Sequence, residues 1–403
     1  MVTRARPPRR VLVVTGSRAE YGLLRPLLQQ LRTSATLRPH LLACGMHLAA
    51  RFGATIEEIA RDDLAPIARV DVLYARESRD AMARYVADTI SATTTVLAEV
   101  DPDLVVVLGD RAEILGVSLA SAYSNRALVH IHGGDLSMGG HDETARHLIT
   151  HLAHLHFPAT TTSASRLRAL GQEPWRIHVT GALGVDAIAA VRPSPASTAA
   201  LLARLGLEGD GPLVLVVQHP VTSQARSAGA QMRATLRAVT STGYRALVIH
   251  PNADTGAQAM IGAIAAATNR SERLRSVPSL SHEEYVTLLR AADVLVGNSS
   301  SGIIEAPSVG LPAVNVGIRQ AGRERAGNVL DVGHDPRQIA TAIGRAIGDR
   351  AVRRRLRNLR SPYGDGHAAR RMVRILERTR VDERLLQKAL TIGRRAAPRK
   401  RRR

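Results

Sequence analysis

Residues 104–135 read LVVVLGDRAEILGVSLASAYSNRALVHIHGGD and carry the strongest fold signal in the chain. Two runs that are apolar at almost every position, Leu104–Leu108 and Ala127–Ile131, flank a helix-like stretch, Ile114–Tyr123. Continuous apolar runs that alternate with helices are typical of a parallel sheet covered on both faces. The stretch therefore predicts a β-α-β unit of an α/β domain.

The same alternation recurs on both sides of this stretch. Near the N-terminus, Val11–Thr15 is strand-like and Leu23–Leu31 is helix-like. The pattern breaks near residues 192–195 and across the Gly-rich, acidic stretch 206–212. A second series then follows, with strand-like runs at Leu213–Val217, Ala246–Ile249, Val294–Val296 and Pro312–Val316. The sequence predicts an α/β protein with two domains whose parallel sheets face a central cleft.

These breaks define the predicted organisation of the chain. It comprises a disordered basic N-terminus (1–10), a first domain (11–190), a linker (191–211), a second domain (212–350), C-terminal helices (351–390) and a disordered basic tail (391–403).

The net charge of +20 is concentrated at the two ends of the chain. Residues 351–403 hold 19 Lys and Arg against 4 Asp and Glu, and residues 1–10 hold 4 Arg and no acid. Only 2% of the residues are aromatic, which leaves few platforms for stacking bases. We expect no specific nucleic-acid partner, and a polyanion-binding protein is the alternative that the basic ends favour.

Cysteine usage and hydropathy exclude several further classes of protein. The single cysteine, Cys44, excludes a disulfide framework and a cysteine-rich zinc site, and it fits a reducing compartment. No apolar run approaches the roughly 18 residues of a membrane-spanning helix. We expect a cytoplasmic protein without a membrane partner, a metal or a cofactor.

The loop 297–302, Gly-Asn-Ser-Ser-Ser-Gly, lies between a predicted strand and a predicted helix. A helix N-terminus offers free N–H groups and a positive dipole end, serine hydroxyls add donors, and glycine lets a phosphate come close. The loop therefore predicts a phosphate site, and Glu305 on the first helical turn is placed to accept hydrogen bonds from vicinal hydroxyls such as those of a ribose. Ordinary serine capping of the helix is the alternative.

Histidines end two strands of the second series, in His219-Pro220 and in His250-Pro251-Asn252. Ligands of open α/β sheets bind at the carboxyl ends of strands, so both imidazoles are expected at one cleft. Neither histidine has a third partner at metal-ligand spacing, so zinc is not predicted. A structural role is the alternative for each.

Charged groups follow the strands of the first series, and they include Asp110, Arg111, His132, Asp135, Asp142 and Glu143. Carboxyl groups clustered with histidines can divide general-acid and general-base roles when their environments separate their pKa values. A buried ion pair is the alternative for Asp110, and helix capping is the alternative for Asp142 and Glu143. The opening loop Thr15–Gly22 matches neither GxGxxG nor a P-loop, and its Arg18 is a candidate diphosphate clamp.

Eight motifs in order resemble the hydrolysing UDP-N-acetylglucosamine 2-epimerase family, the enzymes that start sialic-acid and related nonulosonate pathways. They are Thr15–Gly22, Gly109–Arg111, His130–Asp135, Asp142–Phe157, Gln218–Thr222, His250–Asn252, Gly297–Pro307 and Arg319–Arg323. The resemblance implies the GT-B architecture, with two Rossmann-like domains around a nucleotide-sugar cleft and final helices that cross back onto the first domain. It also implies a homo-oligomer, either a dimer or a tetramer.

The chemistry that the resemblance implies is anti elimination of UDP through a 2-acetamidoglycal, followed by water addition that releases N-acetylmannosamine. The candidate catalytic residues are Asp110, Asp135, Asp142, Glu143 and His219. The candidate substrate-binding residues are Arg18, Arg111, His132, His250, Asn252, Ser299, Ser300, Ser301, Gly302, Glu305 and Arg319. Which carboxylate removes the C2 proton stays open.

The chain departs from the family pattern on the sugar side. His132 stands where sialic-acid members carry Glu, Asp135 stands where many relatives have Glu, and His151 stands where a Lys is common. These departures leave a UDP-2,4-diacetamido-6-deoxy sugar as an alternative substrate. A non-hydrolysing epimerase and a GT-B glycosyltransferase are the alternative reactions.

Overall fold

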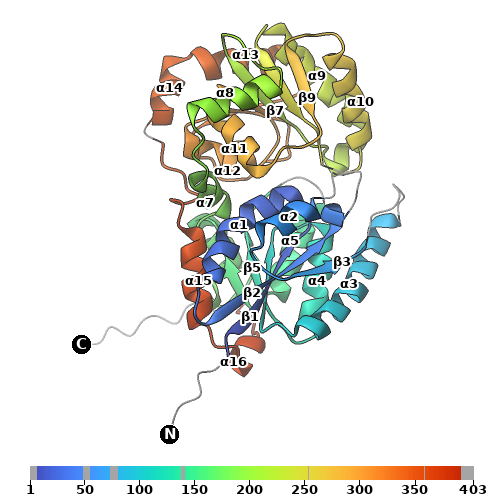
Figure 1. Ribbon diagram of the computed structural model, residues 1–403, viewed down its shortest axis with the longest axis vertical. Coiled ribbons are helices and arrows are strands. Elements are labelled where there is room, and N and C mark those ends of the chain that lie inside the picture. The colour runs from blue at the N-terminus through green and yellow to red at the C-terminus, as the bar shows by residue number, and fades with distance from the viewer. Residues whose placement is uncertain are drawn as a thin grey trace, which may run out of the picture.

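The computed structural model describes residues 7–48, 55–72, 80–137, 141–252, 254–357 and 359–391. The described chain forms two α/β domains, one above the other in Figure 1. The predicted tail 391–403 lies outside the described residues beyond Thr391.

The first domain is built on a six-stranded parallel sheet of order β3-β2-β1-β4-β5-β6. Its strands are β1 (Arg9–Thr15), β2 (Leu37–Cys44), β3 (Ile67–Val70), β4 (Leu104–Leu108), β5 (Ala127–Ile131) and β6 (Leu155–Phe157). Its helices are α1 (Arg18–Arg32), α2 (Ile56–Asp62), α3 (Ala81–Val100), α4 (Ala112–Tyr123), α5 (His141–Leu152), α6 (Thr161–Ala169) and α7 (Leu183–Ala190), with short 3-10 helices at Gly45–Leu48 and Pro174–Arg176.

The second sheet, β12-β11-β10-β7-β8-β9, has the same order when its strands are counted from β7. Its strands are β7 (Leu213–Val217), β8 (Arg245–Ile249), β9 (Leu274–Val277), β10 (Val294–Gly297), β11 (Ala313–Val316) and β12 (Val329–Val332). Its helices are α8 (Pro195–Arg204), α9 (Ala228–Ser241), α10 (Ala257–Thr268), α11 (His282–Ala291), α12 (Ser301–Ile304) and α13 (Pro336–Gly348), with 3-10 helices at Thr222–Ser227 and Ala306–Val309.

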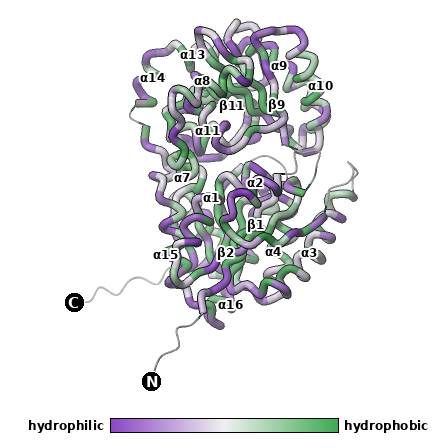
Figure 2. Tube along the Cα trace, viewed as in Figure 1, coloured by the Kyte–Doolittle hydropathy of each residue, from purple (hydrophilic) through white to green (hydrophobic). Residues whose placement is uncertain are grey.

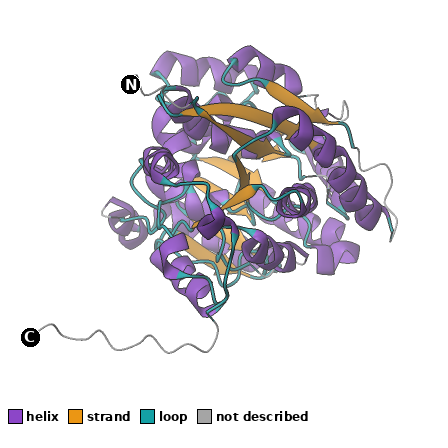
Figure 3. Cartoon of the chain, turned by 90° about the horizontal axis from the view of Figure 1, so that it is seen from below, coloured by secondary structure: helices purple, strands orange, loops and turns teal. Residues whose placement is uncertain are grey.

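Both sheets are buried on both faces because their central strands are apolar at successive positions. In β1, Val11 and Val13 enter one hydrophobic core, whereas Leu12 and Val14 enter the core on the opposite face. Helices cover the sheets on both sides, and hydrophobic residues gather along the strands in the interior (Figures 2 and 3). The predicted pair of parallel-sheet domains is therefore confirmed.

The chain returns to the first domain after α14 (Arg350–Arg357). Helix α15 (Ala368–Arg378) packs against α1 and contributes Met372 and Leu376 to the core under the first sheet (Figure 1). Its last carbonyls accept hydrogen bonds from the Arg9 guanidinium, at 2.8 Å for Leu376 and 3.0 Å for Glu377. The short helix α16 (Glu383–Leu386) follows.

Two segments differ from the sequence prediction. Strand β1 starts at Arg9, so the last two residues of the expected disordered N-terminus (1–10) belong to the first sheet, where they pair with β2. The expected linker 191–211 contains α8. This helix is amphipathic, and Leu201 on its apolar face packs in the core of the second domain. No helix among the described residues has the length and apolar character needed to cross a membrane.

Candidate active site

A cavity of about 520 Å³ lies between the two domains at the carboxyl ends of the central strands. Several predicted site residues line it, namely Arg18, His219, His250, Asn252, Ser299, Ser300, Ser301, Glu305 and Arg319. In both sheets the strand order reverses here, between β1 and β4 and between β7 and β10, which is where open α/β sheets bind ligands. Among the described residues, no three His, Cys, Asp or Glu side chains converge as a metal site would require.

The loop after β10 is held open by Asn298. Its side chain accepts a hydrogen bond from the N–H of His219 at 2.7 Å and donates one to the carbonyl of His219 at 2.8 Å. Its own carbonyl accepts hydrogen bonds from Arg319 at 3.3 Å and Gln320 at 3.0 Å. These bonds tie together three loops and place Ser299 and Ser300 on the cavity wall.

The helix after this loop is shorter than the sequence suggests. Helix α12 spans only Ser301–Ile304, so its dipole is small, and the N–H and hydroxyl groups of the loop are the main donors. Ser301 is already engaged, because Tyr285 donates a hydrogen bond to its hydroxyl at 2.6 Å and its side chain hydrogen-bonds Glu305. Gly302 packs against Leu295 and Ala313 instead of lining the cavity.

His219 is a neutral imidazole of defined tautomer. Burial, with the charges of Arg319 and Arg111, lowers its pKa to about 3. Its Nδ1 accepts a hydrogen bond from the N–H of Asn252 at 3.1 Å. Its proton is therefore on Nε2, and the ring presents a neutral N–H donor on the cavity wall.

Arg18 crosses between the domains. Its Nε pairs with Glu58 at 2.7 Å, and its Nη1 donates a hydrogen bond to Ser279 of the second domain at 3.0 Å. The guanidinium thus lies at the rim of the cavity with a carboxylate already bound to it.

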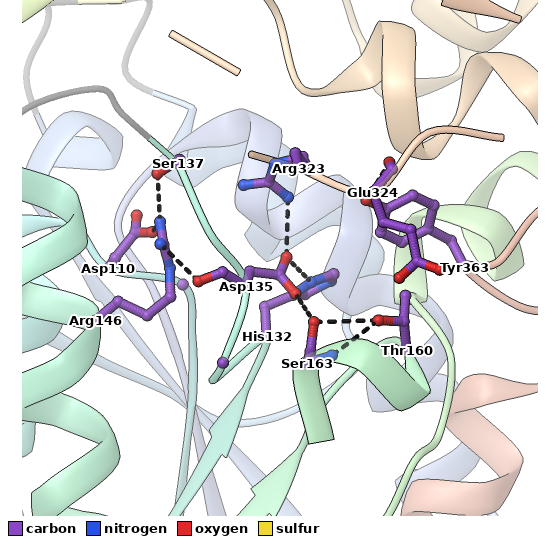
Figure 4. A network of polar contacts seen from close by, with 12 residues as sticks. Asp110, His132, Asp135, Ser137, Arg146, Thr160, Ser163, Arg323, Glu324 and Tyr363 are labelled. Carbon is purple, nitrogen blue, oxygen red and sulfur yellow. Dashed lines mark hydrogen bonds and ion pairs between the residues drawn. The ribbon is translucent and has the colours of Figure 1, made fainter. Parts of the chain in front are cut away.

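The first domain contributes an ionic network centred on Arg146, which is 2% exposed (Figure 4). The guanidinium forms short ion pairs with Asp110 and Glu143 and donates a hydrogen bond to Ser137 at 2.9 Å. Burial alone would raise the pKa of Asp110, but the paired Arg146, together with the charges of Arg323 and Arg319, holds that pKa below its usual value. Asp110 is therefore an ionised carboxylate with one fixed partner.

Asp135 lies beside this network and is almost completely buried (Figure 4). One carboxylate oxygen accepts hydrogen bonds from His132 Nδ1 at 3.1 Å and from Arg323 at 2.9 Å, and the other accepts one from Ser163 at 2.9 Å. The bond fixes the proton of His132 on Nδ1. His132 itself has a φ of +67°, a conformation that non-glycine residues rarely adopt.

Asp142 differs from the other carboxyl groups because it has no dominant cation. Burial and the nearby charges of Asp110 and Asp254 raise its pKa to about 6, against the opposing effects of Arg319 and Arg111. Asp142 therefore changes protonation near neutral pH, the property that a general base needs. Arg319 links this group to the cavity, since it lines the cavity wall and lowers the pKa of Asp110 as well.

Arg111 forms an ion pair with a neighbouring carboxylate. Its Nε binds Glu113 at 2.7 Å and lies 3.8 Å from Glu20. Burial and the charge of Glu113 raise the pKa of Glu20 to about 7, although Arg111 opposes this. The Arg111 side chain that follows β4 is thus part of a small charge network with Glu113 and Glu20, and it is not a free cation.

Sequence reasoning missed Arg146, Arg323 and Ser163 as members of the site. Arg146 pairs with Asp110 across 36 residues, and Arg323 pairs with Asp135 across 188 residues. Arg146 and Arg323 lie within two of the motifs, which was the only available signal, whereas Ser163 lies outside all of them. Spacing along the chain says nothing about such contacts.

Two Rossmann-like domains, with a donor-lined cavity between them and an ionic cluster at the strand ends of the first, define a protein of GT-B architecture. The family model described as UDP-N-acetylglucosamine 2-epimerase matches residues 29–377. The chain therefore belongs to the UDP-N-acetylglucosamine 2-epimerase family, whose members are enzymes.

Individual relatives agree with this assignment. The chain is 34% identical over 380 residues to UDP-N,N'-diacetylbacillosamine 2-epimerase (hydrolyzing) from Legionella pneumophila, covering 94% of this chain and 98% of that protein. It is 31% identical to UDP-N-acetylglucosamine 2-epimerase from Neisseria meningitidis, covering 84% and 87%. The crystal structure of UDP-GlcNAc 2-epimerase from Neisseria meningitidis bound to UDP-GlcNAc has the same fold, with a TM-score of 0.78 at 19% identity, over 92% of this chain and all of that one.

Proposed function

We propose that the protein is a hydrolysing 2-epimerase that converts a UDP-2-acetamido sugar and water into UDP and the free 2-epimeric sugar. The observation that carries the proposal is the division between a cavity wall of hydrogen-bond donors in the second domain and a cluster of charged groups in the first, in which the pKa of Asp142 is raised to about 6. A diphosphate leaving group needs the former, and removal of a C2 proton needs the latter.

The second domain would hold the nucleotide. Ser299 and Ser300 supply hydroxyl donors, His219 supplies a neutral N–H, and Arg319 supplies a cation at the same wall. These groups stabilise the negative charge that develops on the β-phosphate oxygen as the C1–O bond breaks. Glu305, whose pKa is raised by burial, stands behind Ser301 as the acceptor for ribose hydroxyls.

In the first step, Asp142 takes the proton from C2. The C2–H electron pair forms the C1=C2 double bond, and the C1–O pair leaves with UDP. We assign the base to Asp142 and not to Asp110, because Asp110 is held by Arg146 and is the weaker base. Asp110 then keeps Arg146 and the N-terminal end of α5 in place.

In the second step, water adds across the double bond of the glycal, with a proton at C2 from the opposite face and hydroxide at C1. We assign delivery of this proton to His132: Asp135 holds its Nδ1–H, and the proton that reaches C2 leaves from Nε2. The water that gives hydroxide to C1 returns its other proton to Nε2, and Asp142 releases the proton it took from C2 to solvent. The sum is one water consumed and one UDP released.

Two sugars are candidates for the substrate. The Legionella relative is named for N,N'-diacetylbacillosamine, and a Campylobacter jejuni protein that is 30% identical carries the same sugar in its name. These similarities favour the 2,4-diacetamido-6-deoxy sugar. UDP-N-acetylglucosamine, named for the Neisseria relative, is the second candidate.

Proton NMR in heavy water tests the reaction with each UDP-sugar in turn. A hydrolysing epimerase releases UDP and a free 2-epimeric sugar with deuterium at C2. A UDP-linked 2-epimer would instead identify the non-hydrolysing reaction. Turnover that requires an added acceptor would identify a glycosyltransferase.

A further inference from the structure

Arg323 is a residue of the second domain that binds deep within the first. Its Nη1 donates a hydrogen bond to Asp135 Oδ2 at 2.9 Å, and the two side chains are only 11% and 3% exposed. Figure 4 shows the guanidinium entering the network from the side opposite Arg146. A buried ion pair between domains resists separation, since opening would leave each charge without its partner.

The loop that carries Arg323 also holds the nucleotide wall. Arg319 and Gln320 both donate to the carbonyl of Asn298, directly before Ser299 and Ser300. At the other end of the loop, Gly322 packs so closely on Leu136 of the first domain that a side chain there would meet it. One short loop therefore spans from the nucleotide wall to the sugar side.

Arg323 and the His132 imidazole are linked through one carboxylate oxygen of Asp135. Asp135 Oδ2 accepts both the Arg323 N–H and the His132 N–H, so the position of this oxygen depends on both domains. Ser163 binds the other oxygen, Oδ1, but comes from the same domain as Asp135. The orientation of His132 is thus sensitive to how the domains meet.

We propose that Arg323 is an interdomain latch and a positioning residue: through Asp135 it orients His132 only when the cleft is closed. The kinetic part of this inference rests on the proposed function, whereas the structural part does not. With this latch, the second step of the reaction would proceed only after the two domains have closed, with the nucleotide wall of the second domain against the sugar side of the first.

The test compares Arg323→Gln with Arg323→Lys and Ser163→Ala, using Arg204→Gln as a matched control. Arg204 forms an exposed ion pair with Glu284 within the second domain. Small-angle scattering of the ligand-free proteins should give a larger radius of gyration for Arg323→Gln only. Equal radii for Arg323→Gln and the wild type would overturn the latch, whether or not any UDP-sugar is turned over.

The kinetic arm separates positioning from simple loss of binding. Arg323→Gln should lower kcat by about 100-fold, the usual effect of a misplaced catalytic group, while the Kd of UDP changes little. Arg323→Lys should recover part of the loss, and Arg204→Gln should match the wild type. In a double-mutant cycle, Asp135→Asn added to Arg323→Gln should cost much less than the product of the single effects, whereas multiplicative effects would contradict a shared role.

If no variant, including the wild type, turns over a UDP-sugar, the proposed function fails but the scattering result still decides the latch. Thermal unfolding of each variant checks that it is folded. If Asp135→Asn does not fold, the Arg323→Lys recovery carries the kinetic conclusion. No recovery by lysine, together with unchanged scattering, would assign Arg323 a merely local role.

Discussion

The two halves of the cleft use the same sheet order but carry opposite chemistry. The second domain lines the cavity with two serine hydroxyls and the neutral His219 imidazole, and Arg319 is a cation beside them. The first domain presents carboxylates held in ion pairs, Asp110 by its own Arg146 and Asp135 by Arg323 of the second domain. The difference teaches that topology fixes where a ligand lies, whereas the residues at the strand ends fix what happens to it.

The largest effect should come from Asp142, the proposed base in the charged half. Asp142→Asn is expected to lower kcat by about 10²–10⁴-fold, because the amide does not accept the C2 proton. Calorimetry should give a Kd of UDP close to that of the wild type, since the proposed UDP site lies in the other half. A kcat near the wild-type value would remove Asp142 from proton transfer and break the proposed division.

A smaller effect is expected in the neutral half. His219→Ala should weaken UDP binding by about tenfold, the loss of one hydrogen bond to a charged group. Because its pKa is about 3, His219 stays neutral from pH 5 to 8, so its contribution to UDP affinity should not change over that range. An affinity difference between His219→Ala and the wild type that appears only below pH 6.5 would mean that the ring binds as a cation.

The pH profile sharpens the comparison further. The base acts when deprotonated, so kcat/KM should rise with pH through an apparent pKa of about 6. The negative charge of Asp254 is one cause of this raised pKa, so Asp254→Asn should move the midpoint to lower pH by up to about one unit. A midpoint that stays in place or rises would assign the acid limb to another group, of which Glu20 is the first candidate because burial raises its pKa to about 7.

The smallest effect is expected on the stability of the first domain and not on the rate of the reaction. Lys388 Nζ donates hydrogen bonds to the carbonyls of Thr150, His151 and Ala153 at 2.9, 2.8 and 2.7 Å, at the carboxyl end of α5. Lys388→Met should lower the free energy of unfolding of the first domain by about 1–3 kcal/mol, since these acceptors lose their partner. The single tryptophan, Trp175, which stacks 4.2 Å from Arg176, reports this unfolding by fluorescence. An unchanged midpoint would show that water replaces the ammonium group at no cost.

How much the sequence predicts depends on where its signal lies. The bounds of β4, β5 and β7 match the predicted runs to the residue, because central strands are apolar on both faces. Strand β2 escapes notice because Arg38, Pro39 and His40 interrupt its apolar pattern, and the short edge strand β12 is only partly buried.

The same contrast holds within the site. The serines and the glutamate of the nucleotide wall are predictable because Ser299, Ser300 and Glu305 lie within seven consecutive residues, the loop after β10 and the short helix α12. The ionic half is not, because the neighbours that set the behaviour of Asp110 and Asp135 are contributed by α5 and by the second domain. The sequence left open which carboxylate is the base, and the proposed choice depends on these neighbours.

The return of the chain onto the first domain has a consequence for its synthesis. The two cores of the second domain are assembled from one continuous stretch, residues 188–346, and are complete once that stretch has left the ribosome. The core under the first sheet lacks Met372 and Leu376 until residue 376 has been synthesised. The buried Arg176 likewise has no hydrogen bonds to the carbonyls of Leu385 and Gln387 until those residues have been made. The domain that is begun first is therefore finished last. A stop codon shortly before residue 368 would spare every residue of the cleft and still leave the first domain without its final layer.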